Sequence, residues 1–527
     1  MDAVDEPEGP RPAEKDNLVN SLEGDDDGPI EHVSDLIGSW GPFQRRLFPL
    51  VIIVYAISPF SNASLEFYMV KSNYWCKSEN PEVISFTQAR SCQVDTCSEW
   101  IHNTTRTTLV KEWNLICDRF WLASLVLSAY QFGYLISSFV IGIISDRYGR
   151  KFAVIVCLII EIICFLGGAT APSVEVFLIF RFIAGIGGYG RFLGLLLVLV
   201  ETVGPKLRGK IVAAYEWIWH CGILVMILVT YYVENFRHLY LGVALYQFLC
   251  LFLMIFKVQE SIRWQLATGR LDSARRTLHE NVQLNSDQEK AAFERKLDKL
   301  SRFLLKHNSA QERSKTIIDI WRVPRLLRYC LTLYIFWFVQ TFFFYGLKYN
   351  ALDLTGNYFI NMAMIQQSSL IANIFVFLKV EKFRRKTLLF ACMAIASISL
   401  FTTIPLAVNH IFFRNIVLMI GNFAIAMNSM VIYTYTAELF PTTMRHLALG
   451  SCSVFGRVGS ISAPFIIQLN RYMSIQFTLC IFASLGVLGA LISLLLPETR
   501  GKEIPDTVQD MLEMTGEKAE KQTVTSK

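Results

Sequence analysis

The chain contains little charge for its length. Only 18% of its 527 residues are Asp, Glu, Lys or Arg, whereas 53% are hydrophobic, and soluble domains carry about 25% charged residues. This composition excludes a disordered chain and a nucleic-acid-binding protein, despite the formal net charge of +6. The charged residues are clustered and leave long apolar stretches, which indicates a membrane protein with its positive charge in cytoplasmic loops.

The short motifs of enzymes are also missing. The sequence has no Gly-x4-Gly-Lys-Ser/Thr phosphate loop, no cluster of residues with metal-ligand spacing and no nucleophile elbow. We therefore predict that the protein is not an enzyme, that it hydrolyses no ATP directly and that it uses no cofactor or metal.

A cleavable signal peptide is not expected, because the first 36 residues hold twelve acidic residues against Arg11 and Lys15. A signal peptide starts with basic residues followed by an apolar stretch. We expect residues 1–46 to form an acidic, disordered tail in the cytoplasm.

Twelve runs are long and apolar enough to cross a membrane, since the hydrocarbon core needs about 20 residues of helix. They cover residues 47–70, 120–143, 152–171, 175–199, 210–232, 238–257, 328–348, 358–379, 387–407, 411–433, 446–468 and 475–496. They predict an all-α membrane protein with twelve transmembrane helices in two pseudo-symmetric six-helix bundles, 47–257 and 328–496. The charged stretch 258–327 is expected to link the bundles in the cytoplasm.

Basic residues decide the predicted orientation, because Lys and Arg are enriched in cytoplasmic loops. The turns after the second, fourth and eighth spans contain Arg147, Arg150, Lys151, Lys206, Arg208, Lys210, Lys382, Arg384, Arg385 and Lys386. The opposite turns carry at most two each. Both termini, including the tail 497–527, are therefore expected in the cytoplasm, and the long loop 71–119 outside.

The cysteines agree with this orientation. Cys76, Cys92, Cys97 and Cys117 lie in the loop 71–119, and the other eight lie inside apolar spans. Four cysteines in an oxidising compartment predict two disulfides, with three possible pairings. The loop also holds the glycosylation sequon Asn103-Thr104-Thr105, and a second match, Asn62-Ala63-Ser64, lies close to the membrane.

The two halves of the chain repeat each other. The first copy contains Gly142-Ile-Ile-Ser-Asp146-Arg147-Tyr148-Gly149-Arg150-Lys151, Glu201 with Arg208, and Gln259-Glu260-Ser261. The second copy contains the degenerate Glu381-Lys382-Phe383-Arg384-Arg385-Lys386, Glu438 with Arg445, and Pro497-Glu498-Thr499. The separations between copies are nearly equal, so we infer a duplicated six-helix unit, as in transporters whose halves rock about a central site.

We predict that charged residues of these motifs pair across the seam between the halves at the cytoplasmic end, and separate when that side opens. The candidates are Gly142, Asp146, Arg147, Gly149, Arg150, Glu201, Arg208, Glu260, Arg263, Glu381, Arg385, Glu438, Arg445 and Glu498. The alternative is that their charge only directs membrane topology.

Several motifs resemble those of known transporters. Residues 142–151 are similar to the loop motif of the major facilitator superfamily, and Arg181-Phe-Ile-Ala-Gly185-Ile-Gly187 to its fourth-helix motif. More narrowly, Glu112-Trp113-Asn114-Leu115-Ile116-Cys117-Asp118 resembles the signature of the organic cation, carnitine and organic anion transporter family, solute carrier family 22. The resemblance extends to residues 41–45, 260–264, 435–445 and 496–501, although Gln259 and Ile262 replace two prolines. It implies facilitated or exchange transport of small charged organic molecules.

Charged residues inside spans are candidate substrate contacts, because a charge within the membrane is costly. Arg457 lies mid-way along the eleventh span; the resemblance implies Arg here in anion and carnitine carriers, and a guanidinium can bind a carboxylate through two hydrogen bonds. Arg191 either adds selectivity for anions or pairs with Glu216. Glu216, flanked by aromatic residues, either holds an ammonium group or pairs with Arg191. Glu161 is expected to be structural.

The seventh span is aromatic around its whole circumference, so some of its rings are expected to face a central cavity. We expect Trp337, Gln340 and Tyr345 to do so. The resemblance adds Phe192, where cation carriers have Trp, and Asn373, where anion exchangers typically have Lys. Arg457 together with Glu216 would suit a zwitterion such as a carnitine-like betaine.

The sequence therefore predicts a plasma-membrane carrier of small organic ions that works by alternating access, with the organic ion and the lipid bilayer as its partners. One alternative is a proton- or sugar-coupled carrier. Another is a transport-inactive receptor or scaffold with the same fold. A homo-oligomer formed through the outer loop is a further expectation.

Overall fold

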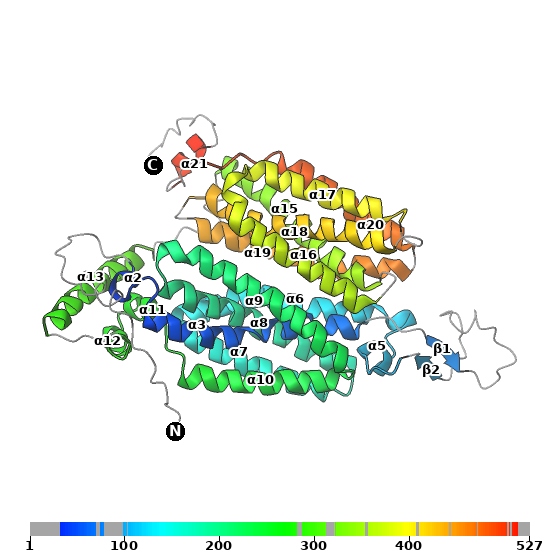
Figure 1. Cartoon of the computed structure of the whole chain (residues 1–527), viewed down its shortest axis with the longest axis horizontal. Helices are drawn as coiled ribbons and strands as arrows, with labels where there is room; N and C mark the ends of the chain where they lie inside the picture. Colours follow the sequence, from blue (N-terminus) through cyan, green and yellow to red (C-terminus); the bar gives the residue numbers. More distant parts are fainter. Residues whose placement is uncertain are drawn as a thin grey trace, which may run out of the picture.

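The protein consists mainly of long helices arranged in two layers (Figure 1). The computed structural model describes residues 32–69, 74–77, 99–102, 104–281, 287–311, 321, 323–353, 357–406, 411–441, 444–471, 473–502, 505 and 508–514. One layer is the first half of the chain, with α3 (Pro42–Tyr55), α4 (Ser58–Ala63), η1 (Ser64–Tyr68), α6 (Trp121–Tyr148), α7 (Arg150–Ala169), α8 (Val174–Thr202), α9 (Pro205–Tyr232) and α10 (Phe236–Phe256). The other is the second half, with α15 (Pro324–Asp353), α16 (Tyr358–Lys379), η4 (Val380–Lys382), α17 (Arg385–Thr403), α18 (Ile411–Leu439), α19 (Arg445–Ile467), η5 (Gln468–Arg471) and α20 (Ile475–Ser493).

Each of the twelve predicted spans has its helix. Eleven segments of the described chain are long and apolar enough to cross a membrane. The helix of the remaining predicted span is α19, which carries Arg445, His446 and Arg457 together with several serines. Its polarity reflects a position at the centre of the molecule, where its neighbours are other helices.

Local sequence explains where helices start. The side chains of Ser173, Asn235 and Ser474 each accept a hydrogen bond from a backbone N–H in the first turn of α8, α10 and α20, which satisfies a donor that the helix itself leaves free. The first span is instead divided into α3, α4 and η1, with Pro49 inside α3 and Pro59 in the first turn of α4. Proline removes a backbone donor and interrupts a helix.

The outer surface of the bundle is apolar. Along α10, Leu245, Phe248, Phe252 and Phe256 are between 53% and 71% exposed. They follow the helical repeat and form one exposed apolar face. Such a face is stable in lipid, where every backbone hydrogen bond is already made within the helix.

Two short glycine-lined contacts bring helices of the first half together. A Cβ atom at Gly133 of α6 would collide with the carbonyl oxygen of Phe182 in α8, and one at Gly185 of α8 would collide with the carbonyl oxygen of Tyr130. Only glycine permits this approach, which explains the glycine of the Arg181–Gly187 motif.

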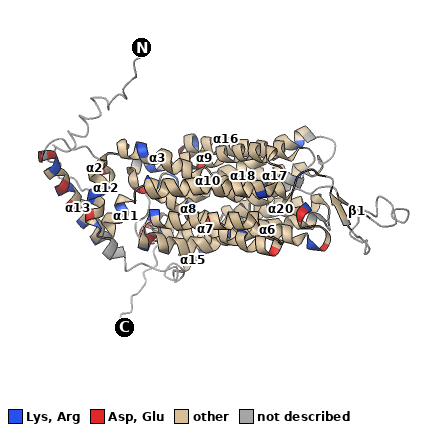
Figure 2. Ribbon diagram, turned by 90° about the horizontal axis from the view of Figure 1, so that it is seen from below, with Lys and Arg blue, Asp and Glu red and all other residues tan. Residues whose placement is uncertain are grey.

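The ends of the bundle differ in structure. At one end, here called the hairpin end, lie β1 (Tyr74–Lys77), β2 (Glu99–His102), α5 (Leu109–Glu112) and η3 (Cys117–Arg119). At the other, the linker end, lie α2 (Ser34–Ile37), α11 (Ile262–Ala267), α12 (Leu271–His279), α13 (Asp287–Gln311) and α21 (Val508–Met514). Figure 2 shows that Lys, Arg, Asp and Glu gather at the two ends and are sparse between them.

The hydrophobic cores show that the halves meet closely near the hairpin end. One core of first-half residues also includes Phe359, Met362 and Ile365 of α16. The core at the linker end, as far as the chain is described, consists of first-half, α2 and linker residues alone. The halves are therefore joined by apolar packing near the hairpin end and less so at the linker end.

The cysteines follow the predicted division. Cys117 takes part in a disulfide, and the eight cysteines of the spans are free thiols. Cys92, Cys97 and the sequon residue Asn103 lie outside the described residues, so the pairing with Cys76 or its neighbours stays a prediction. The second sequon is a wrong prediction, because Asn62 is 9% exposed on α4, inside the bundle; a glycan has no room there.

Candidate functional site

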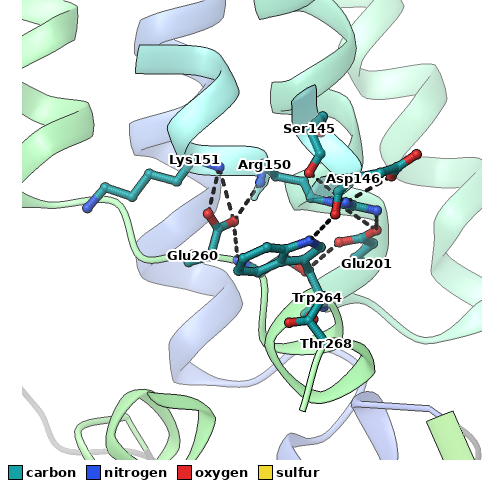
Figure 3. Close-up of polar contacts among 9 residues, drawn as sticks. Ser145, Asp146, Arg150, Lys151, Glu201, Glu260, Trp264 and Thr268 are labelled. Atoms are coloured by element: carbon teal, nitrogen blue, oxygen red, sulfur yellow. Dashed lines mark hydrogen bonds and ion pairs between the residues drawn. The ribbon is translucent and has the colours of Figure 1, made fainter. Parts of the chain in front are cut away.

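The repeated motif of the first half builds a charged network at the linker end (Figure 3). Arg150 Nη2 lies 3.1 Å from Glu201 Oε1 and Arg150 Nη1 lies 3.0 Å from Asp146 Oδ1. The carboxylate of Glu260 accepts hydrogen bonds from the backbone N–H groups of Arg150 and Lys151, at 2.9 and 3.0 Å. Glu260 thus caps the N-terminus of α7, where a negative charge is favourable.

Gly149 makes this cap possible. Its φ of +114° lies in the region that favours glycine, and a Cβ atom here would collide with Glu260 Oε2. Trp264 Nε1 donates to the carbonyl oxygen of Asp146 at 2.7 Å. The network therefore ties α6, α7 and α8 to the linker helix α11.

The second half repeats the same network. Arg385 Nη2 lies 3.1 Å from Glu438 Oε1, and Glu498 accepts from the backbone N–H groups of Arg385 and Lys386 at 2.8 and 3.3 Å. Thr499 Oγ1 donates to Glu438 Oε2 at 2.6 Å, as Ser261 Oγ donates to Glu201. The two halves inferred to be duplicated thus share equivalent hydrogen bonds at these positions.

Among the described residues, these motif charges do not pair across the seam in this conformation, and such pairing in a state with the linker end closed stays a prediction. Both ion pairs lie within one half, because each arginine starts the helix that packs beside its own glutamate's helix. Arg208 interacts electrostatically with Glu201 of its own half, and side-chain nitrogen atoms of Arg208 and Arg445 are buried without a hydrogen-bond partner in the described chain. The remaining candidates take no part in the two networks as described above. Gly142 has open space around it, and the Arg147 guanidinium lies 5.5 Å from the Tyr148 ring. Arg263 is half-buried and Glu381 is exposed.

The centre of the molecule holds a cation without an acidic partner. Arg457 of α19 is half-buried, and its guanidinium lies 5.1 Å from the ring centroids of Tyr134 on α6 and of Tyr189 on α8. Tyr345 and Tyr433 interact with it electrostatically. Within the described residues no carboxylate lies within ion-pair distance of Arg457. Aromatic faces from the first half thus hold a charge from the second half.

Glu216 is a second charged group without a partner near this point. It lies on α9, is half-buried, and in the described chain makes no ion pair or side-chain hydrogen bond. Tyr433 interacts electrostatically with both Arg457 and Glu216, although it is 50% exposed. Tyr433 therefore places one cation and one carboxylate in the same region of the molecule.

Arg191 does not join this region. Its Nε lies 2.5 Å from Glu161 Oε2 with both side chains 0% exposed, and its Nη1 donates to Ser58 Oγ at 2.6 Å. The predicted alternatives for Arg191, a substrate contact or a pair with Glu216, are therefore both wrong in this conformation. The expectation that Glu161 is structural is confirmed.

Two of the candidates on the aromatic seventh span, Trp337 and Gln340, contact other helices of their own half. Trp337 is 2% exposed and donates to Thr436 Oγ1 at 3.2 Å. Gln340 is 1% exposed and donates to Ser429 Oγ at 2.6 Å. Because both have their polar groups satisfied inside the second half, we correct the prediction that they contact the substrate.

The remaining candidates lie closer to the seam. Tyr345 Oη accepts from Gln131 Nε2 of α6 at 3.2 Å, and the Phe192 ring stacks on Tyr189 at 6.0 Å. Asn373 of α16 is bonded to His220 Nε2 of α9 at 2.7 Å, and His220 Nδ1 lies 3.2 Å from Gln366 Oε1. Asn373 is thus part of a polar tie between the halves. Tyr134, Tyr189 and Tyr433 were not selected from the sequence, which shows only that they are tyrosines within spans.

A comparison of sequences identifies the family. The model of the family described as "Sugar (and other) transporter" matches residues 57–509. The chain belongs to the sugar (and other) transporter family. The transporter is therefore a membrane protein of a carrier family and not of an enzyme family, as predicted from its sequence.

Relatives among characterised proteins are similar over most of the transporter's length. The "Organic cation transporter protein" of Drosophila melanogaster is 27% identical over 90% of this chain and 93% of its own. "Organic anion transporter 3" of Oryctolagus cuniculus is 25% identical over 92% and 93%. "Solute carrier family 22 member 6" of Rattus norvegicus is 28% identical over 82% and 78%.

Solved structures agree on the fold. The xylose transporter XylE from E. coli in an inward-open conformation superposes with a TM-score of 0.63 at 16% identity, covering 88% of this chain and 98% of that one. A sugar-bound structure of XylE, a major facilitator superfamily protein, gives 0.58 at 18% identity over 89% and 98%. The transporter has the major facilitator fold, as predicted.

Proposed function

We propose that the protein carries small organic ions across the plasma membrane by alternating access of its two halves. Unpaired Arg457 is the observation that carries the proposal. A half-buried arginine within a membrane span and without a carboxylate is unfavourable, and an organic carboxylate that binds between the halves removes this cost by accepting hydrogen bonds from the guanidinium. The printed names of the relatives, organic cation and organic anion transporters, support the same class of substrate.

The preferred substrate in this proposal carries a carboxylate, as an anion or as a carnitine-like zwitterion. Arg457 would bind the carboxylate, the rings of Tyr134 and Tyr189 would enclose it, and Glu216 would receive an ammonium group beside Tyr433. The five contributing helices, α6, α8, α9, α18 and α19, come from both halves, so that rocking of the halves would assemble and disassemble the site.

We further propose that the hairpin end faces outward and that both termini lie in the cytoplasm. A disulfide at Cys117 supports this orientation, because disulfides persist in oxidising compartments. The basic residues at the linker end support it as well. Assembly of copies through the outer loop stays a prediction.

Uptake by the wild-type protein tests the function. In proteoliposomes we expect saturable uptake of radiolabelled organic carboxylates or betaines, and less uptake of simple cations, because Arg457 is a central cation with no acidic partner in the described chain. Liposomes without protein serve as the control, and membrane voltage is varied to reveal the transported charge. Correctly folded protein that transports none of the three classes would contradict the proposal and favour a receptor.

A second candidate function, coupling to protons, is favoured by one observation. Glu216 has no ion-pair or hydrogen-bond partner within the described chain, so its carboxyl group is available to bind and release a proton. If coupling occurs, a proton gradient directed inward should drive accumulation by the wild type, and Glu216→Gln should abolish this accumulation while leaving exchange at equal pH. Accumulation that is unaffected by Glu216→Gln would exclude this role.

A further inference from the structure

A buried ion pair joins the two halves near the hairpin end. Lys348 Nζ lies 2.8 Å from Glu66 Oε1, and the two side chains are 6% and 3% exposed. Glu66 belongs to η1 of the first half and Lys348 to α15 of the second. In contrast to Arg150–Glu201 and Arg385–Glu438, this pair crosses the seam.

The structure holds Glu66 in place from its own half. Arg181 of α8 donates to the carbonyl oxygens of Ser61 and Asn62 at 2.6 and 2.8 Å, which fixes the backbone just before η1. Arg181 also interacts electrostatically with Glu66. The second carboxylate oxygen of Glu66 is buried without a hydrogen-bond partner in the described chain. The direct partner of the carboxylate is therefore Lys348.

Apolar and polar contacts surround the pair and close the seam. The rings of Phe67 and Phe359 stack at 5.4 Å. Ser124 Oγ and Ser128 Oγ of α6 donate to the carbonyl oxygens of Pro464 and Ile461 of α19 at 3.0 and 2.8 Å. A path from the hairpin end to Arg457 opens only if these contacts and the ion pair separate together.

We propose that Glu66 and Lys348 form the outer gate of the transport path and, once separated, the entry site for a charged organic solute. This inference rests on the proposed function and on the outward position of the hairpin end. In the closed state each charge neutralises the other. In the open state an incoming carboxylate can take the place of Glu66 beside Lys348, and an ammonium group can take the place of Lys348 beside Glu66. The solute thereby compensates the separation of the pair.

If Glu66 and Lys348 form a gate, the effects of replacing each of them should not add up in the double variant. Removing one partner leaves the other buried and unpaired in the closed state, whereas opening exposes it to water. Glu66→Gln and Lys348→Met should therefore each favour the outward-open state. The double variant Glu66→Gln/Lys348→Met leaves no unpaired charge and should close normally.

A cysteine between the halves reports the opening. Ser128 is 0% exposed, so Ser128→Cys in this chain should react slowly with a membrane-impermeant maleimide added outside. We expect either single variant to increase the labelling rate by roughly tenfold, which corresponds to about 1.4 kcal/mol in the opening equilibrium. The double variant should return to the rate of the parent. The same variants without Ser128→Cys correct for labelling of native cysteines.

Glu112 and Arg237 provide the matched control. They also form an ion pair at the hairpin end, but both belong to the first half. Glu112→Gln and Arg237→Met should leave the labelling of Ser128→Cys unchanged. Three results would overturn the gate. These are labelling that does not respond to Glu66→Gln and Lys348→Met, labelling that responds equally to the control substitutions, and labelling that rises further in the double variant.

The entry site is tested on the double variant, whose gate closes without charges. We expect the KM for a transported organic ion to rise several-fold with little change in maximal rate, and the Glu112→Gln/Arg237→Met variant to keep the wild-type KM. An unchanged KM in Glu66→Gln/Lys348→Met would overturn the entry role. The labelling experiment does not depend on transport. A protein that shows the expected labelling pattern but carries no organic ion would therefore refute the proposed function and still support the gate.

Discussion

Replacing Arg457 with glutamine is expected to reduce kcat/KM for organic carboxylates by roughly 10- to 100-fold, because a hydrogen bond to a charged group contributes about 1.5–3 kcal/mol. The expected loss is large because the guanidinium has no acidic partner in the described chain and its remaining neighbours are tyrosine rings. Uptake into proteoliposomes with equal amounts of protein measures the effect.

Two controls distinguish substrate binding from folding at Arg457. Arg457→Lys keeps the charge but loses the planar two-point contact, and should recover only part of the activity. Tyr433→Phe keeps the ring and should change the KM less than Arg457→Gln does. If Arg457→Gln lowers uptake of cations and carboxylates equally, or lowers the melting temperature strongly, Arg457 is structural and the assignment of the binding site fails.

Replacing Glu161 with glutamine is expected to lower the free energy of unfolding by about 3–5 kcal/mol, because a charge left alone after its buried partner is removed is strongly unfavourable. Glu161 and Arg191 are both 0% exposed and lie 2.5 Å apart, so water cannot replace the lost carboxylate. Thermal unfolding of the purified transporter in detergent measures the change.

The matched control for Glu161 lies on the same helix as Arg191. Glu175 pairs with Arg119 at 3.5 Å with side chains 62% and 53% exposed, and water screens an exposed pair so that it contributes little to stability. Glu175→Gln should therefore be nearly neutral. The double variant Glu161→Leu/Arg191→Leu should regain much of the stability lost in Glu161→Gln. Equal stability of Glu161→Gln and Glu175→Gln would show that Arg191 finds another partner.

The structure describes a conformation in which the halves are in closer contact near the hairpin end than at the linker end. Contacts between the halves near the hairpin end include the Glu66–Lys348 ion pair and the core that contains Phe359. At the linker end, the core has first-half, α2 and linker members among the described residues, and nitrogen atoms of Arg208 and Arg445 are buried without partners. The predicted pairing of motif charges across the seam would require the opposite state, with the linker end closed.

Matching roles of equivalent residues in the two halves could be predicted from the sequence, because the same residue types recur at nearly the same spacing. The repeated motifs predicted matching roles for Arg150 and Arg385, and both start a helix that is capped by a glutamate. Sequence reasoning failed for Arg191, because Glu161 and Glu216 are both acidic residues within spans and only helix packing decides which is close. It also missed Glu66 and Lys348, which are 282 residues apart and belong to no motif.

The amino-acid sequence by itself determined the number and order of the spans and the duplication. Hydrophobicity over about 20 residues and short motif spacing act within one segment, so they can be read without a structure. The tertiary structure alone decided which charges are neutralised by an ion pair and which have no ion-pair partner in the described chain. A buried charge pairs with the acid or base that folding brings nearest. In this protein Arg457 and Glu216 have no ion-pair partner in the described chain, whereas Glu66 and Lys348 form an ion pair between the two halves.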